Sequence, residues 1–175
     1  GRDLSQFERW YSQAGTPRVR LESHYDEKER TLTVSLSQFC PPTPGQTEKQ
    51  PFLIPFAIGL LDSKGNDMPL RLKGGKDSGT SCILELSDAS QTFTFVDVAE
   101  KPVISALRNF SAPVILEYEQ SDDELLHLLS HDSDHFNRWE AGQRLAARRL
   151  VSLTKAVQDG QPLTLDTAFA DAFRT

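Results

Sequence analysis

The hydrophobic pattern of this 175-residue chain changes in type at Ser121. Between residues 17 and 120, apolar side chains recur at every second position in short runs that turn-forming residues separate. Runs spaced by turns every 8–12 residues or so are typical of an antiparallel β-sandwich, and about seven strands are expected. After Ser121, apolar side chains recur every three or four residues, which predicts about two or three helices. The sequence therefore predicts a mainly β fold followed by C-terminal helices.

The predicted strands begin with a hairpin. Residues 19–25 and 32–36 alternate apolar and polar side chains, and the charged segment 26–30 lies between them as a turn. Residues 52–61 resume as a more buried strand, and residues 69–72 are expected to pair back on it as a short strand. Further strands are expected at 82–86, 93–95, 103–107 and 114–118.

Helices are predicted at both ends of the chain. Residues 1–15 carry aromatic side chains at helical spacing, which indicates a short amphipathic helix. After the strands, Ser121 followed by Glu124 forms a capping box ahead of an apolar run. A longer helix is expected to begin near Ser133, and a third opens within residues 164–173. The apolar face of the long helix comprises Phe136, Trp139, Ala146, Leu150, Leu153 and Val157.

Charge and composition argue against several classes of function. The formal net charge is −6 and the isoelectric point is about 5.2. This argues against a nucleic-acid partner, because contact with phosphates needs a basic surface. No apolar run approaches the roughly 20 residues of a membrane-spanning helix, so no membrane partner is expected. Cys40 and Cys82 are too few for a disulfide framework and indicate free thiols in a reducing compartment, hence a cytoplasmic location.

The motifs of common hydrolases are missing from the chain. It contains neither the H-E-x-x-H motif of zinc peptidases nor the G-x-S-x-G motif of serine hydrolases. The glycine-rich segment 73–80 departs from the spacing of a phosphate-binding loop and is interpreted as a hairpin loop. We therefore predict no catalytic residue in this chain.

Three histidines, His127, His131 and His135, lie four residues apart. On one continuous helix they would share a face and, with two neighbouring aspartates, could bind a metal ion. The helix start expected at Ser133 breaks that face. A structural or helix-terminal role is therefore favoured, and no metal ligand is predicted.

The long helix also carries a basic cluster of three arginines, Arg144, Arg148 and Arg149. Glu140 lies four residues before Arg144, which is the spacing of a surface ion pair on a helix. The same arginines could instead face an acidic neighbouring domain.

Three segments of the chain carry long motifs. Residues 7–19 have the sequence FERWYSQAGTPRV, which contains a W-x-x-Q-x-G-x-P run. This run resembles the junction after the catalytic domain in the bacterial aminopeptidase N family, where the chain enters a β-sandwich. Residues 43–58, TPGQTEKQPFLIPFAI, are similar to the segment of that sandwich containing EKQP and IPFAI. Residues 131–143, HDSDHFNRWEAGQ, are similar to a family helix with the pattern DxFxRWxAxQ. The resemblance extends over essentially the whole chain.

Members of this family are zinc metallopeptidases that remove single residues from the N-termini of peptides. They comprise an N-terminal β domain, a thermolysin-like catalytic domain, a small immunoglobulin-like sandwich and a large helical domain. The resemblance implies that residues 1–16 are the tail of the catalytic domain and 17–120 the immunoglobulin-like β-sandwich. Residues 121–175 would be the first helices of a truncated C-terminal helical domain.

The resemblance places the zinc cofactor outside this chain. The family's zinc motif, its downstream glutamate ligand and its G-x-M-E-N motif have no counterpart in the sequence. Zinc is therefore implied for the catalytic domain of the parent enzyme, with no cofactor in this fragment. The fragment by itself is expected to be inactive.

The implied role is that of a non-catalytic scaffold that positions a helical lid over the catalytic domain. Its partners would be these two domains of the parent chain, and peptides would be substrates of the whole enzyme. Interdomain packing is expected from Phe7, Trp10 and Tyr11 on the catalytic side, and from Phe136, Arg138, Trp139 and Gln143 on the helical side.

Two other interpretations are possible. The second interpretation is a stand-alone immunoglobulin-like protein-binding module with a helical appendage. The third interpretation is a small metal-dependent protein that uses His127, His131 and His135.

Overall fold

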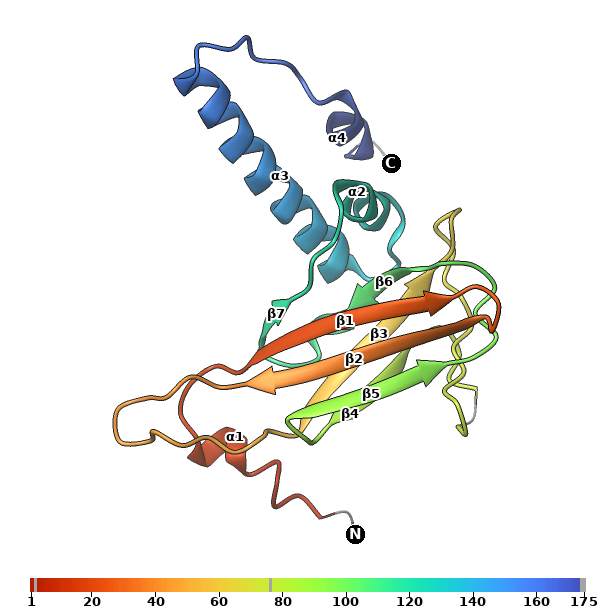
Figure 1. Cartoon of the computed structure of the whole chain (residues 1–175), viewed down its shortest axis with the longest axis vertical. Coiled ribbons are helices and arrows are strands. Elements are labelled where there is room, and N and C mark those ends of the chain that lie inside the picture. The colour runs from red at the N-terminus through yellow and green to blue at the C-terminus, as the bar shows by residue number, and fades with distance from the viewer. Residues whose placement is uncertain (2, 76, 174–175) are drawn as a thin grey trace.

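The alternating segments form two facing β-sheets, and the C-terminal helices lie to one side of this sandwich (Figure 1). The computed structural model describes residues 1, 3–75 and 77–173, so Lys76 of the glycine-rich segment lies outside the described residues. One sheet has the order β5-β2-β1-β7 and the other the order β4-β3-β6. The strands are β1 Arg18–Asp26, β2 Thr31–Phe39, β3 Ile54–Leu61, β4 Cys82–Leu86, β5 Ser90–Phe95, β6 Val103–Ala106 and β7 Ile115–Glu117. The predicted mainly β fold with C-terminal helices is confirmed.

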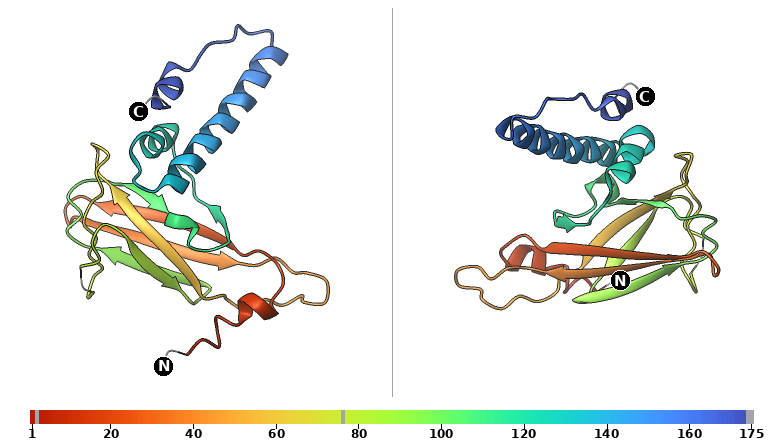
Figure 2. Two further views of the ribbon diagram at one scale, coloured as in Figure 1. Left: turned by 180° about the vertical axis from the view of Figure 1, so that it is seen from behind. Right: turned by 45° about the horizontal axis from the view of Figure 1, so that its top comes forward.

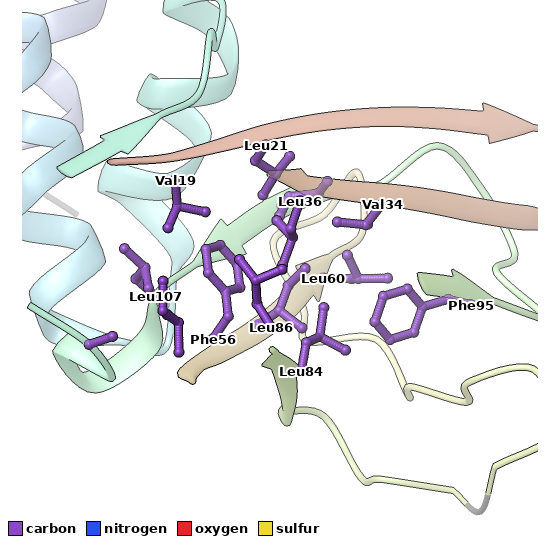
Figure 3. Packing of buried hydrophobic residues seen from close by; sticks show 14 of the residues in the cluster. Val19, Leu21, Val34, Leu36, Phe56, Leu60, Leu84, Leu86, Phe95 and Leu107 are labelled. Atoms are coloured by element: carbon purple, nitrogen blue, oxygen red, sulfur yellow. The ribbon is translucent and has the colours of Figure 1, made fainter. Parts of the chain in front are cut away.

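The predicted first hairpin is present, and its alternation decides which side chains enter the core. β1 and β2 pair in antiparallel register along their whole length. Because successive side chains of a strand point to opposite faces, Val34 and Leu36 of β2 both meet the other sheet. Figure 3 shows them with Phe56 and Leu60 of β3 between the sheets, and all four are fully buried. Burial of each such side chain stabilises the fold by about 1.5–3 kcal/mol.

β3 is buried on both of its faces. Phe56 and Leu60 point into the core, whereas Gly59 and Leu61 face away from it. The side chain of Arg108 covers Gly59, and apolar side chains of the helices cover Leu61. The second face of β3 is therefore the surface on which the helical part of the chain rests.

One strand pairing differs from the prediction of a wholly antiparallel sandwich. β7 pairs with β1 in parallel. After β6, in the opposite sheet, the 3₁₀ helix η1 (Arg108–Phe110) carries the chain across to the first sheet. β7 then enters at the edge of β1 and runs in the same direction, over three residue pairs.

Two other predicted elements are reduced. Residues 69–72 do not form the expected strand on β3, because Leu70 exchanges backbone hydrogen bonds with Ser78 and Gly79 instead. The helix expected within residues 1–15 is the single turn α1 (Arg9–Ser12). Helices this short have little stability of their own, so contacts with the sandwich hold it in place.

α2 (Asp122–His131) begins with the predicted capping box. The Ser121 hydroxyl accepts a hydrogen bond from the Glu124 backbone at 3.1 Å, and the Glu124 carboxylate accepts from the Ser121 backbone at 2.8 Å. α3 (His135–Gln158) begins at an Asp134 cap, so the helix breaks after His131 as predicted. α4 (Thr167–Ala172) follows a loop and lies beside α2, while α3 extends away from the sandwich (Figure 2). Within the described ranges, no helix has both the length and the apolar character needed to cross a membrane.

The side of α3 that packs is not the apolar face that the sequence predicts. Its buried residues are Asn137, Ala141, Gly142 and Leu145. Leu150, on the predicted face, is 64% exposed. Small side chains allow close approach to α2: a Cβ at Gly142 would lie 3.2 Å from the Leu129 side chain. The packing face therefore combines small side chains, which allow this close approach, with the fully buried Leu145.

α2 rests on the turn that follows β3. The His127 Nε2 atom lies 2.8 Å from the carbonyl oxygen of Asp62 and therefore donates its proton there. The next histidine on this face, His131, lies against Gly65. Gly65 has a φ of +86°, so it supplies both the left-handed turn and the space for the ring.

Gly65→Ala should destabilise the chain more than Gly79→Ala. Both glycines have left-handed backbone, at φ +86° and +68°, so alanine costs about 1–2 kcal/mol at either position. A Cβ at Gly65 would also lie 2.4 Å from the His131 Cβ, whereas the space at Gly79 is open. In urea denaturation we expect Gly65→Ala to lose at least roughly 1 kcal/mol more, from overpacking. Equal losses would contradict the contact between α2 and the turn.

Candidate functional site

A buried arginine lies where the sandwich meets the helices. Arg108, on η1, is 4% exposed. Its Nη2 donates to Asp67 at 2.6 Å and to Asp132 at 3.2 Å, its Nε to the Ser105 hydroxyl at 2.8 Å, and its Nη1 to the Thr80 carbonyl at 3.2 Å. A desolvated charge needs such partners, because burying it unpaired is very unfavourable. We call these five residues the Arg108 cluster.

The backbone around Arg108 is shaped to place this side chain. Leu107, Asn109 and Phe110 all have positive φ, at 56°, 56° and 49°, a conformation that costs a non-glycine residue about 1–2 kcal/mol. Gly59 of β3 lies beneath the guanidinium, where a Cβ would come within 2.0 Å of the Arg108 Cζ. The turn and the missing side chain together admit the guanidinium to the junction.

The segment between α2 and α3 supplies the other half of the junction. Asp132 accepts a hydrogen bond from the Asp134 backbone at 2.9 Å. The Asp134 carboxylate caps α3 through the Asn137 backbone at 2.9 Å and accepts from the Asn109 backbone of η1 at 2.8 Å. The Asn137 side chain donates to the Ser105 hydroxyl at 2.8 Å. The N-terminus of α3 is therefore hydrogen-bonded directly to the sandwich.

The charges of the Arg108 cluster are not balanced. One guanidinium meets two carboxylates, Asp67 and Asp132. The Asp132 side chain is fully buried, and its Oδ2 has no hydrogen-bond partner among the described residues. Desolvation raises the pKa of Asp132 above its ordinary 3.8, and its contacts with Ser105, the Asp134 N–H and Arg108 offset only part of that rise. Folding therefore makes this carboxyl harder to ionise than it is in the unfolded chain.

The arginines of the long helix hold the segment that leads from β7 into α2. Arg144 donates to the Gln120 side chain at 2.6 Å and to the Tyr118 carbonyl at 2.8 Å. Arg148 donates to Asp122 at 2.6 Å and to the Gln120 carbonyl at 3.0 Å. Arg149 pairs with both Asp122 and Asp166, and Asp166 is the N-cap of α4. All three arginines of the basic cluster thus have partners within the chain. The sequence alone suggests a surface ion pair with Glu140 or an acidic neighbouring domain instead.

The three histidines do not come together. His127 and His131 are neighbours on α2, with ring centroids 5.1 Å apart, and His135 begins α3 beyond the break. In the part of the chain that the structure describes, no three His, Cys, Asp or Glu side chains are placed to hold a metal ion. These residues therefore do not fit a zinc centre.

Trp10 has its partners within the chain. Its indole N–H donates to the Leu53 carbonyl at 2.9 Å, and its ring lies 4.5 Å from that of Phe52, between centroids. Its neighbours Phe7 and Tyr11 are exposed, Tyr11 to 86%. Tyr11 is thus the most exposed of the three, and interdomain packing of all three stays a prediction.

An aromatic row lies at the start of α3. The ring of Phe136 lies 5.2 Å from that of Phe110 and 5.8 Å from that of Trp139, between centroids. Trp139 is 57% exposed. Arg138 donates to the Leu129 carbonyl at 3.1 Å and so ties α3 to α2, while Gln143 is exposed. Contacts of these residues with another domain also stay a prediction.

Sequence reasoning missed the Arg108 cluster. No motif surrounds Arg108, and its partners come from four separate segments of the chain. The one available signal was the pair of aspartates around Ser133, which the capping rule explained as a helix start. Asp134 has that role, whereas Asp132 pairs with the arginine.

These features define a class: an immunoglobulin-like sandwich joined by a polar junction to a helical unit. Two family models match the chain. The first, described as a domain of unknown function (DUF3458) with an Ig-like fold, matches residues 15–119. The second, described as DUF3458_C with ARM repeats, matches residues 122–175. The chain belongs to the DUF3458 family.

Similar proteins confirm the resemblance to aminopeptidase N. That enzyme from Escherichia coli (strain K12) is 46% identical over 172 residues, which cover 98% of this chain and 19% of the enzyme. Aminopeptidase N of Haemophilus influenzae is 37% identical over 163 residues, covering 93% of this chain and 18% of the enzyme. The solved structure of Legionella pneumophila aminopeptidase A in complex with aspartic acid matches 99% of this chain and 18% of its own, with a TM-score of 0.75 and 25% identity. The chain therefore spans about a fifth of these enzymes and matches a non-catalytic part of them.

Arg108→Met should be strongly destabilising, because it leaves the Asp132 carboxylate buried without its cation. Breaking a buried ion pair from one side costs about 3–5 kcal/mol. Arg18→Met is the matched control, since Arg18 pairs with Glu117 on the surface and such pairs contribute about 0–1 kcal/mol. Urea denaturation of both variants measures the difference. A loss at Arg108 as small as that at Arg18 would contradict a buried, paired guanidinium.

The stability of Asp132→Asn relative to the parent chain should improve as the pH rises. Because the folded-state pKa of Asp132 is raised, the stability linked to its proton is present below pH 3.8 and is lost as the pH rises through the folded pKa. Asparagine mimics the neutral carboxyl at every pH, so the variant avoids that loss.

Asp122→Asn is the control of opposite sign. Hydrogen bonds from Arg148 and Arg149 lower the pKa of Asp122, so its contribution is present above pH 3.8 and is lost as the pH falls. Denaturation from about pH 2.5 to 7 should show the two variants diverging from the parent chain in opposite directions as the pH rises. Parallel curves would contradict the assignment.

Proposed function

We propose that this chain is the non-catalytic linker of a zinc-dependent aminopeptidase, in which it positions the helical region relative to the catalytic domain. The observation that carries this proposal is the partial match with aminopeptidase N, where 98% of this chain aligns with 19% of the enzyme. A sandwich joined to helices through a buried arginine suits a mechanical connection between two parts of a larger polypeptide.

The zinc ion is proposed to act outside these residues. Because the histidines do not form a set of ligands, no chemical step is derived for the side chains of this chain. In a zinc peptidase the metal activates water for attack on the peptide carbonyl. This chain would contribute by holding the helical region where it closes over that site.

The proposed partners are the catalytic domain and further helices of the same polypeptide, with peptides as substrates of the whole enzyme. Tyr11 on one side, and Trp139, Leu150 and Val157 along α3, are exposed apolar side chains. Helical repeats bury such faces by stacking on neighbouring repeats. The match to ARM repeats therefore favours further helices as the cover of the exposed side of α3.

A cytoplasmic location is part of the proposal. Cys40 and Cys82 are both free thiols, which persist in a reducing compartment. Burial raises the pKa of Cys82 to about 11. This thiol therefore stays protonated and unreactive at neutral pH.

Peptidase assays on two proteins test the proposal. This chain alone should show no hydrolysis of an alanine chromogenic amide above the blank, because its sequence has no H-E-x-x-H motif. The longer natural polypeptide that contains it should be active, lose activity with a chelator and regain it with zinc. Turnover by the purified chain would overturn the proposal. A naturally occurring protein of only this length would favour the stand-alone binding module.

A further inference from the structure

The helical part is attached to the sandwich at both ends of α2. At the N-terminal end, Gln120 donates to the Ile104 carbonyl of β6 at 3.5 Å, and Arg144 of α3 donates to Gln120 at 2.6 Å. At the C-terminal end, Asp132 meets Arg108. The ten residues of α2 separate these attachments by about 15 Å at 1.5 Å per residue. A rigid body held at one point can rotate in any direction, whereas two separated attachments leave only rotation about the line that joins them.

The apolar contact between the sandwich and the helices is too small and too unspecific to set the orientation of the helices alone. In the apolar cluster around the helices, the sandwich contributes Leu61 as a buried residue and Val103 as a partly buried one. Hydrophobic contacts have no preferred direction, so a helix pair could pivot on them. The hydrogen bonds of Arg108 are directional, because the guanidinium is planar and presents its donors in a fixed fork.

Arg108 is held on the sandwich from several sides. The side chain lies on Gly59, in the central strand of its sheet, and donates to the Ser105 hydroxyl and the Thr80 carbonyl. Asp132, by contrast, lies in the short segment between the two helices. The arginine therefore transmits the orientation of the sheet to the point where α2 turns into α3.

We propose that Arg108 is a positioning residue, which sets the angle of the α2–α3 pair relative to the sandwich and so, if the proposed function holds, the placement of the helical region for peptide turnover. It acts through Asp132 and touches no substrate. Gly59 is the second part of this device, since any side chain there would displace the guanidinium.

Hydrogen exchange in this chain tests the positioning directly. In Arg108→Met, we expect the acceleration of exchange at amides of α2 and of the first turns of α3 to exceed that at β2 and β5 by about ten-fold, because the strands report only the global loss of stability. Val34→Ala, in the sandwich core away from the junction, is the control and should accelerate exchange in the strands. Arg108→Lys keeps the charge without the fork and should give partial protection. Uniform acceleration in Arg108→Met, or unchanged helices, would overturn the proposal.

Gly59→Ala displaces the guanidinium without removing any charge. We expect it to accelerate helix exchange about ten-fold in the parent chain but less than about three-fold in the Arg108→Met background, because the flexible methionine can yield. Equal effects in both backgrounds would mean that alanine acts on β3 itself, and would contradict the assigned role of Gly59.

Kinetics of the complete enzyme test the consequence for turnover. Arg108→Met should lower kcat/KM for a peptide about ten-fold, since small misplacements of distant parts reduce turnover, with bound zinc unchanged. Arg108→Lys should recover part of this loss, which a simple loss of folded protein would not explain. Unchanged kcat/KM with mobile helices would overturn the link to turnover. An inactive parent enzyme would overturn the proposed function, while the exchange result would still decide the role of Arg108.

Discussion

The structure depends on keeping a guanidinium inside the protein. A buried charge must be met by partners in several directions, because none of its lost hydration is returned by apolar neighbours. That requirement explains features that lie far apart along the sequence. Gly59 leaves room for the group, the left-handed turn of η1 aims it, and Ser105 and Asp67 receive it from the sandwich. Asp132 completes the set from the helical side. One ion therefore makes two structural layers depend on each other.

The local sequence pattern predicts the fold wherever one face of a helix or strand is exposed to solvent and the other is buried. Alternation in β1 and β2 places their side chains correctly, and the capping box at Ser121 marks the start of α2. The parallel approach of β7 was not predictable from alternation, since a strand pattern carries no direction. Its direction depends on how η1 crosses between the sheets.

The junction was not predictable for two physical reasons. α3 packs through Ala141, Gly142 and Asn137, whose small or polar side chains score poorly as an apolar face. Of the predicted face, Trp139, Leu150 and Val157 are exposed, whereas Phe136, Ala146 and Leu153 are half-buried. The Arg108 cluster is assembled from distant segments, and nothing local marks an arginine as buried. The motif resemblance identified the family without reaching this site, because the shared segments describe neighbouring residues rather than tertiary contacts.

The order of the cluster along the chain has a consequence for synthesis. Asp67 precedes Arg108 by 41 residues and Asp132 follows it by 24. A ribosome therefore releases the first carboxylate before the arginine and the second only after the last strand is complete. The nascent sandwich can enclose Arg108 and Asp67 as a neutral pair, with no unmatched charge inside it. When the helices then pack on the sandwich, they bring Asp132 as a second carboxyl. The excess of carboxyl groups over the single guanidinium therefore forms only in the last step of assembly.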